Sequence, residues 1–387
     1  MFAIFKVYYT TEDMVKIRPL VVLFFLAITL FVSAGDSSSE KFNPGDMIMH
    51  HILDSHEWHI LDWPTTTIDT TNNKNDTIFG KTPVSIPLPI ILFHEGHGLT
   101  AFMSSKFHHG DSVYWASDSI GYFYDHGKIT CVNSVVSDKS QWAYNDEATD
   151  KLWDFSITKN VSSLFFSILI LLFVFLSAGK VYMKSPEKTP RGLRGFLEIM
   201  IVFVRDDIAK PAIGEKHYNR YMPFLLTVFF FIWLNNLLGL IPVFPGGANL
   251  TGNIAVPLVL AAMVFIITTL SGKKSYWQHI FAMPGVPKPV LIMLTPVEII
   301  GVFLKPIVLM IRLFANITAG HIIILSFFSL IFIFGDINIF AGYGASVMSV
   351  LFVIFMTMLE LLVAFLQAYV FTLLSAIYFG AAVEEEH

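Results

Sequence analysis

The C-terminal half of the chain contains two apolar runs, each roughly twice as long as a membrane-spanning helix needs to be. They cover about residues 290–334 and 346–383, whereas about 20 helical residues cross the hydrocarbon core of a bilayer. Runs of this length must tilt strongly, break or lie partly in the interface. Pro296 and Pro306 mark positions where the first run is expected to bend. The segment FGDINIFAGYGAS turns the chain between the runs, so the pattern predicts a long, tilted antiparallel hairpin of two helices.

The first run carries an arginine at membrane depth. Arg312 lies in the stretch Lys305 to His321, which contains no acidic residue. A charge at this depth costs about 2.5–3.5 kcal/mol on insertion scales, so such a residue is a functional hypothesis by default. The alternative is an arginine that snorkels to the headgroups from a helix end.

Further polar residues follow regular spacings within the two runs. Glu298, Lys305 and Arg312 are seven residues apart and share one helical face, as do Glu360 and Gln367 on the second run.

A hairpin with its turn near residue 340 brings Arg312 beside Gln367 and His321 beside Glu360. At 3.6 residues per turn, however, Arg312 and His321 point to opposite faces of their helix, while their partners share a face. A bend at a proline or a bulge would relieve this conflict. Buried polar groups that join helices without a transport role are the alternative.

The N-terminus resembles a secretory signal peptide over residues 1–34. Lys16 and Arg18 precede the apolar core LVVLFFLAITLFV, and Val32-Ser33-Ala34 is a small-residue cleavage site. Met14 as the initiator would give a tighter signal. The alternative is a retained first transmembrane helix.

Residues 35–158 are polar and aromatic, with short strand-like pieces between turn residues. We expect a small extracytoplasmic domain of β or irregular structure. It holds nine of the thirteen histidines, of which His94 and His97 form the densest cluster with Glu95. The spacing differs from the HExxH of zinc proteases, so solvated or packed histidines are favoured over a metal site.

The composition supports an all-α polytopic membrane protein behind this domain. The 387 residues are 54% hydrophobic and 14% charged, whereas soluble domains carry about 25% charged residues. Further spans are predicted at about 161–178, 222–241 and 253–270, for five crossings in total. The segment 195–213 mixes apolar residues with Asp206 and Asp207, as an amphipathic helix on the membrane surface does.

The loops after the first and third spans are basic and therefore cytoplasmic. This orientation places residues 35–158 outside and the C-terminus inside. The predicted organisation is a signal peptide (1–34), an extracytoplasmic domain (35–158), a membrane domain (159–383) and an acidic tail (384–387).

Three motifs resemble subunit a of the bacterial F-type ATP synthase, the F0 sector family whose signature reads RLFxN. Residues 305–321 contain Lys-Pro, then Ile-Arg-Leu-Phe-Ala-Asn, then Ala-Gly-His. The run from Glu360 through Gln367 is similar to the final helix of that family, and Asn235-Asn236-Leu-Leu-Gly239-Leu-Ile-Pro resembles its first long hairpin segment. The match covers about residues 160–383; the N-terminal extension lies outside it.

The resemblance implies a role for each matched residue. Arg312 would be the stator arginine that faces the carboxylates of the rotating c-ring. The outer half-channel would be lined by Asn316, His321, Glu360 and Gln367, and Glu298 would lie in the cytoplasmic one.

Two positions depart from the pattern of some family members. Some have glutamate where His321 lies and histidine where Glu360 lies, so the pair is exchanged here. Some have aspartate where this chain has Gly239, and the channel entrance would then depend on Asn235 or Asn236.

The resemblance also implies partners and location. The chain would conduct protons to and from the c-ring so that proton flow drives ATP synthesis, with no catalytic site, cofactor or metal of its own. Its partners would be the c-ring, the stator subunit b, the F1 sector through the stalks, and the lipid bilayer, with no nucleic acid. It would be a multi-pass protein of the bacterial inner membrane, with residues 35–158 periplasmic and the C-terminus cytoplasmic.

Two other function classes are considered. A secondary ion-coupled transporter also has broken helices and charges at mid-membrane depth, but it predicts paired repeats, and the sequence has no repeat at a fixed period. A membrane metallohydrolase using His94, Glu95 and His97 requires a third ligand on a nearby helix, and this region is not helical in character.

The cleavage site generates a first prediction. The mature protein begins near Gly35, because the apolar core is short and ends in a small-residue site. N-terminal sequencing of the purified protein checks this, and a chain that keeps residues 1–34 contradicts it.

Overall fold

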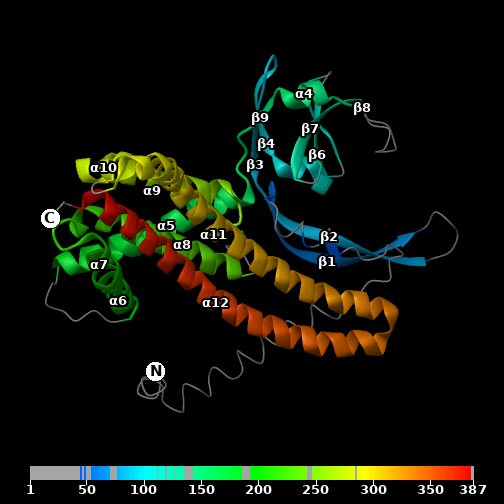
Figure 1. Cartoon of the computed structure of the whole chain (residues 1–387). Helices are drawn as coiled ribbons and strands as arrows, with labels where there is room; N and C mark the ends of the chain where they lie inside the picture. Colours follow the sequence, from blue (N-terminus) through cyan, green and yellow to red (C-terminus); the bar gives the residue numbers. More distant parts are fainter. Residues whose placement is uncertain are drawn as a thin grey trace, which may run out of the picture. The chain divides into compact units, whose positions relative to one another are not determined.

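The structure is a computed structural model of the chain (Figure 1). The predicted signal peptide lies outside the described residues, as does the end of the acidic tail. The described residues are 54–69, 76–110, 112–117, 120–125, 127–134, 143–184, 192–241, 246–283, 286–384 and three isolated residues between 44 and 48.

Among the described residues, the strands lie between residues 57 and 154, in the segment for which the sequence predicts β or irregular structure. β1 (Glu57–Asp69) and β2 (Asp76–Pro87) form a two-stranded sheet. A second sheet has the order β4-β3-β9 and a third the order β5-β6-β7-β8. Their bounds are β3 (Pro89–His94), β4 (Gly98–Met103), β5 (Tyr114–Ser117), β6 (Ile120–Asp125), β7 (Lys128–Ser134), β8 (Ala143–Tyr144) and β9 (Leu152–Asp154).

The second and third sheets share one apolar core. Ile90 and Leu92 of β3 alternate with more exposed neighbours, as one buried face of a strand requires. They belong to the same buried cluster as Tyr122 of β6 and Cys131 of β7. Burial raises the pKa of the Cys131 thiol, so this lone cysteine packs as a small apolar residue. The short elements η1 (Ser104–Gly110) and α4 (Asp146–Asp150) complete this part.

The rest of the described chain is helical, and four helices are long and apolar enough to cross a membrane. A fifth span results if α9 and α10, which are bent by 104° at their junction, count as one. The chain is therefore a polytopic membrane protein. The helices are α5 (Lys159–Lys184), α6 (Leu193–Phe203), α7 (Lys210–Ile213), α8 (Tyr218–Leu240), α9 (Ala255–Ser271), α10 (Lys274–Phe281), α11 (Lys288–Ile337) and α12 (Ile339–Val383), with the π-helix η3 (Val204–Ala209) joining α6 to α7.

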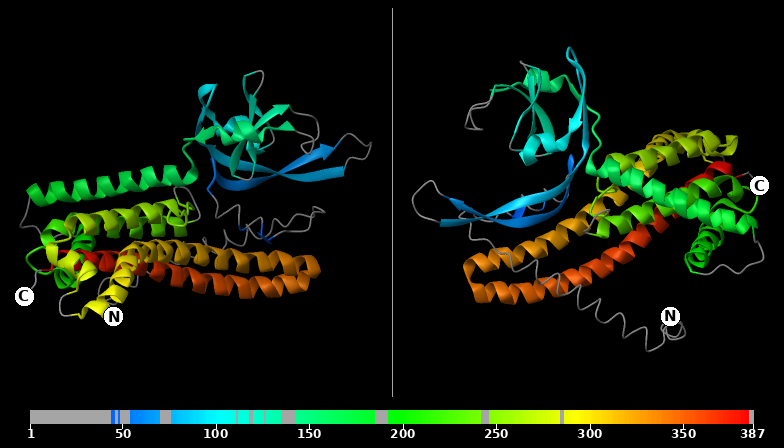
Figure 2. Two further views of the ribbon diagram at one scale, coloured as in Figure 1. Left: turned by 45° about the horizontal axis from the view of Figure 1, so that its top comes forward. Right: turned by 180° about the vertical axis from the view of Figure 1, so that it is seen from behind.

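The two long apolar runs form the predicted antiparallel hairpin. α11 and α12 lie side by side in all the views (Figures 1 and 2). Asn338 ends the first helix in an extended conformation, and its side chain accepts a hydrogen bond from the Phe340 amide at 3.0 Å to cap the second. α11 continues through Pro296 and Pro306 without a break in its helical assignment. The two prolines therefore lie within one continuous helix and do not divide it.

The segment predicted as a surface helix corresponds to α6, η3 and α7. Arg205 and Lys210 pair with Asp206 at 2.9 and 2.8 Å, and their hydrogen bonds hold the pKa of this carboxyl well below its usual range. The opposite side buries Val204 and Ile208 in the helical core. One face is thus charged and the other packed, as the amphipathic pattern predicts.

The hairpin register generates a second prediction. The Phe327 and Phe352 rings lie 3.8 Å apart between centroids. In a Cys131→Ser background, Phe327→Cys with Phe352→Cys forms an intramolecular disulfide on mild oxidation, detected by mass spectrometry. Phe327→Cys with Leu359→Cys, about two turns away, is the matched control. Equal cross-linking of both pairs would contradict the register.

Candidate functional site

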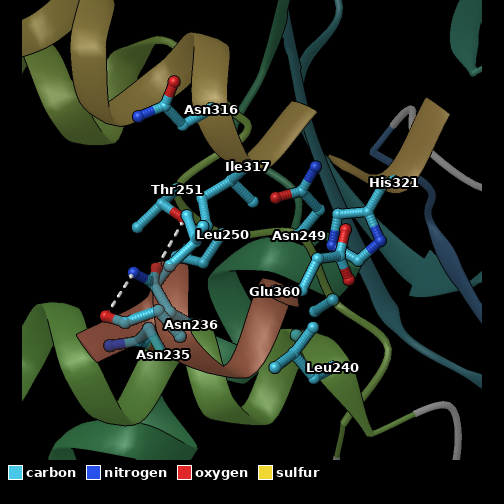
Figure 3. A pocket seen from close by; sticks show the side chains of 14 residues that line it. Asn235, Asn236, Leu240, Asn249, Leu250, Thr251, Asn316, Ile317, His321 and Glu360 are labelled. Atoms are coloured by element: carbon cyan, nitrogen blue, oxygen red, sulfur yellow. Dashed lines mark hydrogen bonds between the residues drawn. The ribbon is translucent and has the colours of Figure 1, made fainter. Parts of the chain in front are cut away.

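A pocket with about 340 Å³ of empty space lies between α8, the loop 246–254 and the α11–α12 hairpin (Figure 3). It is the place where polar side chains from four separate parts of the membrane sequence meet. Its polar lining consists of Asn235, Asn236, Asn249, Thr251, Asn316, His321 and Glu360.

His321 of α11 and Glu360 of α12 both line this pocket, as the hairpin register predicts. Their side chains point toward one another in Figure 3. The Glu360 carboxylate packs directly on Gly320, where an added Cβ would overlap its Oε1 and lie 3.1 Å from its Cδ. A side chain at residue 320 would therefore displace the Glu360 carboxylate from its present position.

His321 also faces α8. Its Nε2 lies 3.9 Å from the position that a Cβ on Gly239 would occupy. An aspartate at that position would therefore place a carboxylate next to the imidazole. In this chain the carboxylate is on α12, at Glu360. Gly239, His321 and Glu360 all line the same pocket.

The two asparagines of α8 are 2% and 3% exposed and make different contacts. Asn236 accepts a hydrogen bond from the Thr251 hydroxyl at 3.0 Å and donates one to the Ala364 carbonyl at 3.4 Å. Asn235 donates to the Phe231 carbonyl at 2.7 Å. Its Oδ1 is buried without a hydrogen-bond partner among the described residues.

The loop 246–254 contributes two residues that the sequence analysis missed. Asn249 and Thr251 are buried and line the pocket. Asn249 Oδ1 accepts from the Gly252 amide, three residues later, at 2.9 Å, while its Nδ2 is buried with no partner in the described chain. Buried polar atoms normally have partners, so these atoms of Asn235 and Asn249 are exceptions among the described residues.

Arg312 lies on a different side of α11. Its side chain is exposed, among the exposed apolar side chains of Val308 and Ile311. Gln367, 4% exposed, donates to the Arg312 main-chain carbonyl at 3.4 Å. Arg312 and Gln367 are therefore in contact, as the hairpin register predicts, but the contact is to the Arg312 main chain and not to its side chain. No bend is needed, because the guanidinium and His321 point in different directions.

The remaining candidates lie elsewhere on α11. Lys305 places its ammonium 5.6 Å from the centre of the Tyr378 ring, and both residues line a second pocket of about 250 Å³ together with Thr268. Glu298 is half-buried and lines neither pocket.

His94 is buried in the strand domain, and its Nε2 bonds to the Ala148 carbonyl at 3.1 Å. Its ring packs edge-on against His97 at 5.1 Å. Among the described residues, no group of three or more histidine, cysteine or acidic side chains is placed to hold a metal. The contacts of His94 are those of a packed histidine.

Comparison with known proteins divides the chain into two regions. A family described as a domain of unknown function matches residues 47–155. The family described as ATP synthase A chain matches residues 161–380, more than half of the chain.

Curated relatives agree with the second match. ATP synthase subunit a of Chloroherpeton thalassium is 43% identical over 238 residues, which cover 60% of this chain and 68% of that protein. ATP synthase subunit a 2 of Chlorobaculum tepidum is 46% identical over 236 residues, covering 59% and 64%. ATP synthase subunit a of Chlorobium phaeobacteroides is 45% identical over 243 residues, covering 61% and 68%. These relatives match the part of the chain whose helical hairpin carries an arginine on an apolar face and lines a polar pocket. By the match over residues 161–380, the chain belongs to the ATP synthase A chain family.

Proposed function

We propose that this chain is the proton-conducting stator subunit of the membrane sector of an F-type ATP synthase. It carries protons through two half-channels to and from the rotating c-ring, and this flow drives ATP synthesis in the partner sector. The observation that carries the proposal is the hairpin geometry. His321 and Glu360 meet in one pocket, while Arg312 stands on an exposed apolar face of the same hairpin. The comparisons give no support to the alternative of a secondary transporter.

The exposed face around Arg312 suits a rotating ring. Phe303, Ile307 and Ile311 are exposed on α11, and Leu351, Phe355 and Leu362 are exposed on α12. A ring carboxylate crosses the lipid only in its neutral form, because a bare charge there is too costly. A neighbouring arginine favours the ionised carboxylate. Each carboxylate therefore loses its proton as it reaches Arg312.

Arginine also suits the barrier between the half-channels. The guanidinium keeps its proton under all physiological conditions, so it does not relay protons itself. Its charge lets a carboxylate pass in the ionised form and opposes the direct movement of a proton between the two channels. Each proton that moves down a membrane potential of 100 mV releases about 2.3 kcal/mol.

The pocket is proposed as the outer half-channel. Asn235, Asn236 and Asn316 supply polar walls, and water at the unpartnered amide atoms would continue the path. His321 with Glu360 forms the relay, because imidazole exchanges protons near neutral pH. Gln367 anchors the helix backbone beside Arg312. On the cytoplasmic side we assign Glu298, together with the second pocket at Lys305 and Tyr378.

The topology follows the charge pattern of the loops. We propose five crossings, with α9 and α10 forming one bent span and α6 to α7 lying on the membrane surface. In this arrangement residues 35–158 are periplasmic, 159–383 form the membrane domain of the bacterial inner membrane, and the C-terminus is cytoplasmic. The c-ring, subunit b and, through the stalks, the F1 sector are the proposed partners.

Arg312 provides the direct test of the mechanism. Arg312→Ala abolishes proton-driven ATP synthesis in membrane vesicles while the complex still assembles, because the exposed side chain makes no packing contact that assembly needs. Arg312→Lys also fails, since lysine loses its proton in apolar surroundings. Leu172→Ala, at an exposed apolar residue of α5, is the control outside this face and keeps synthesis near the wild-type rate. Near-normal synthesis in Arg312→Ala would contradict this mechanism and favour the alternative, in which the Arg312 side chain extends to the lipid headgroups.

Gly320 tests the geometry of the relay. Gly320→Ala lowers proton-driven synthesis by roughly 10-fold to 100-fold, because its methyl group displaces the Glu360 carboxylate. Gly301→Ala is the control on the same helix, where an added Cβ has no neighbour within 4 Å. Alanine has a higher helix propensity than glycine at both positions. A rate of synthesis that falls in Gly320→Ala but not in Gly301→Ala would therefore report the steric conflict with Glu360. Glu360→Asp, which is shorter, partly restores Gly320→Ala; equal rates in both single variants would contradict the assignment.

A further inference from the structure

The outer face of the β4-β3-β9 sheet is apolar and exposed. Phe93 of β3 pairs with Leu99 of β4 on one side and with Trp153 of β9 on the other. Residues directly opposite one another on neighbouring strands point to the same face of a sheet. The three side chains are 41%, 69% and 57% exposed, respectively. They therefore form one apolar row across all three strands.

Further apolar residues flank this row. Ile91 pairs with Ala101, and its carbonyl accepts a hydrogen bond from the Phe155 amide at 2.9 Å. Pro89 pairs with Met103 in the row after that. Residues two apart on a strand share a face, so these side chains lie beside the first row. Within the described strands this face carries no charged residue, whereas a sheet face in contact with water is normally polar.

The other face of this sheet is already covered. It packs against the third sheet in the core that contains Leu92 and Cys131. Val132, the next residue of β7, points to the opposite face, and Tyr144 of β8 pairs with it. The two packed sheets therefore present two outer faces, of which one bears Phe93 and the other bears Tyr144.

The apolar face is connected to a membrane-spanning helix without a free linker. The Ile157 amide donates to the Pro89 carbonyl at 3.0 Å, so strand pairing continues beyond β9. α5 begins two residues later. In this short connection Asp54 accepts hydrogen bonds from the Thr158 hydroxyl at 2.7 Å and from the Asn160 amide at 3.0 Å. The sheet and the helix are thus joined by a hydrogen-bonded segment.

The length of α5 places this connection at the membrane surface. The 25 residues of the candidate span are about 38 Å long as a helix, whereas the hydrocarbon core of a bilayer is about 30 Å thick. The ends of the helix therefore lie at the level of the headgroups. Phe155 precedes α5 by four residues, which cover at most about 14 Å of extended chain. The sheet face therefore begins within reach of the lipid that surrounds the exposed Leu169 and Phe173 of α5.

We propose that the outer face of the β4-β3-β9 sheet is a lipid-binding surface, which lies in the headgroup and upper acyl region of the bilayer and continues the exposed apolar side of α5. The inference goes beyond the proton path and does not depend on it. An exposed apolar patch marks an interaction surface, and the connection to α5 holds this patch beside lipid. Aromatic side chains such as Trp153 favour the interface of a membrane. The strand domain would thereby lie on the membrane by its apolar face.

The test uses the full-length protein in its native complex, reconstituted in liposomes of phosphatidylethanolamine and phosphatidylglycerol. The photoreactive amino acid p-benzoylphenylalanine replaces Phe93 or Phe155, and mass spectrometry identifies what the chain is joined to after illumination. We expect a phospholipid adduct from both positions. The same replacement of Phe173, an exposed residue of α5, is the positive control. Replacement of Tyr144, which is 46% exposed on the other outer face, is the matched control and gives at least fivefold less lipid adduct.

A charge on the face provides a second measurement. Leu99→Glu, in the chain with the photoreactive residue at position 93, lowers the lipid adduct at least fivefold, because a carboxylate opposes entry into an anionic bilayer. Leu99→Met keeps the adduct, and neither change reaches the core because this residue is exposed. Lipid adducts of equal yield at positions 93 and 144 overturn the inference. So do an adduct from position 93 with another subunit or another segment of this chain, and the absence of lipid adducts at 93 and 155 when position 173 gives one.

Discussion

The free-energy cost of a charge at membrane depth is the constraint on which this structure depends. An isolated arginine or glutamate within a span costs several kcal/mol. Four ionisable residues of the hairpin lie in surroundings that differ in how they offset this cost. Arg312 stands on an exposed face, where the proposed mechanism would supply an ionised carboxylate from a partner subunit. His321 and Glu360 share a polar pocket. Lys305 lies over the Tyr378 ring, an arrangement of cation and aromatic face that is attractive.

These solutions depend on how closely the helices approach. Gly320 admits the Glu360 carboxylate against the backbone of α11, and Gly239 leaves the space on α8 that His321 faces. Small residues allow close contact between helices in membranes, where lipid provides no hydrophobic driving force for association. The same glycines that let the helices pack therefore create the space in which the titratable pair meets. His321 on α11 and Glu360 on α12 both line this space.

The strand domain and the membrane helices are connected through polar contacts at one helix end. Asp54, Ser55 and His56 form hydrogen bonds with the segment that leads into α5. A helix cap contributes about 1 kcal/mol.

The apolar lengths, the position of Arg312 and the spacing of the polar residues were readable from the sequence, because membrane burial imposes strict composition and helical periodicity. The turn near residue 340 followed from composition, and the hairpin register followed from the turn. The sequence left open how Arg312 and His321, nine residues apart, could both meet partners on one face of α12. The tertiary structure answers this, since Gln367 contacts the Arg312 backbone and not its guanidinium. It also decided that Asn249 and Thr251 fold inward from a loop and that Lys159 is buried. Such contacts join segments distant in sequence, and local patterns carry no information about which loop atoms or helix ends a neighbouring helix will cover.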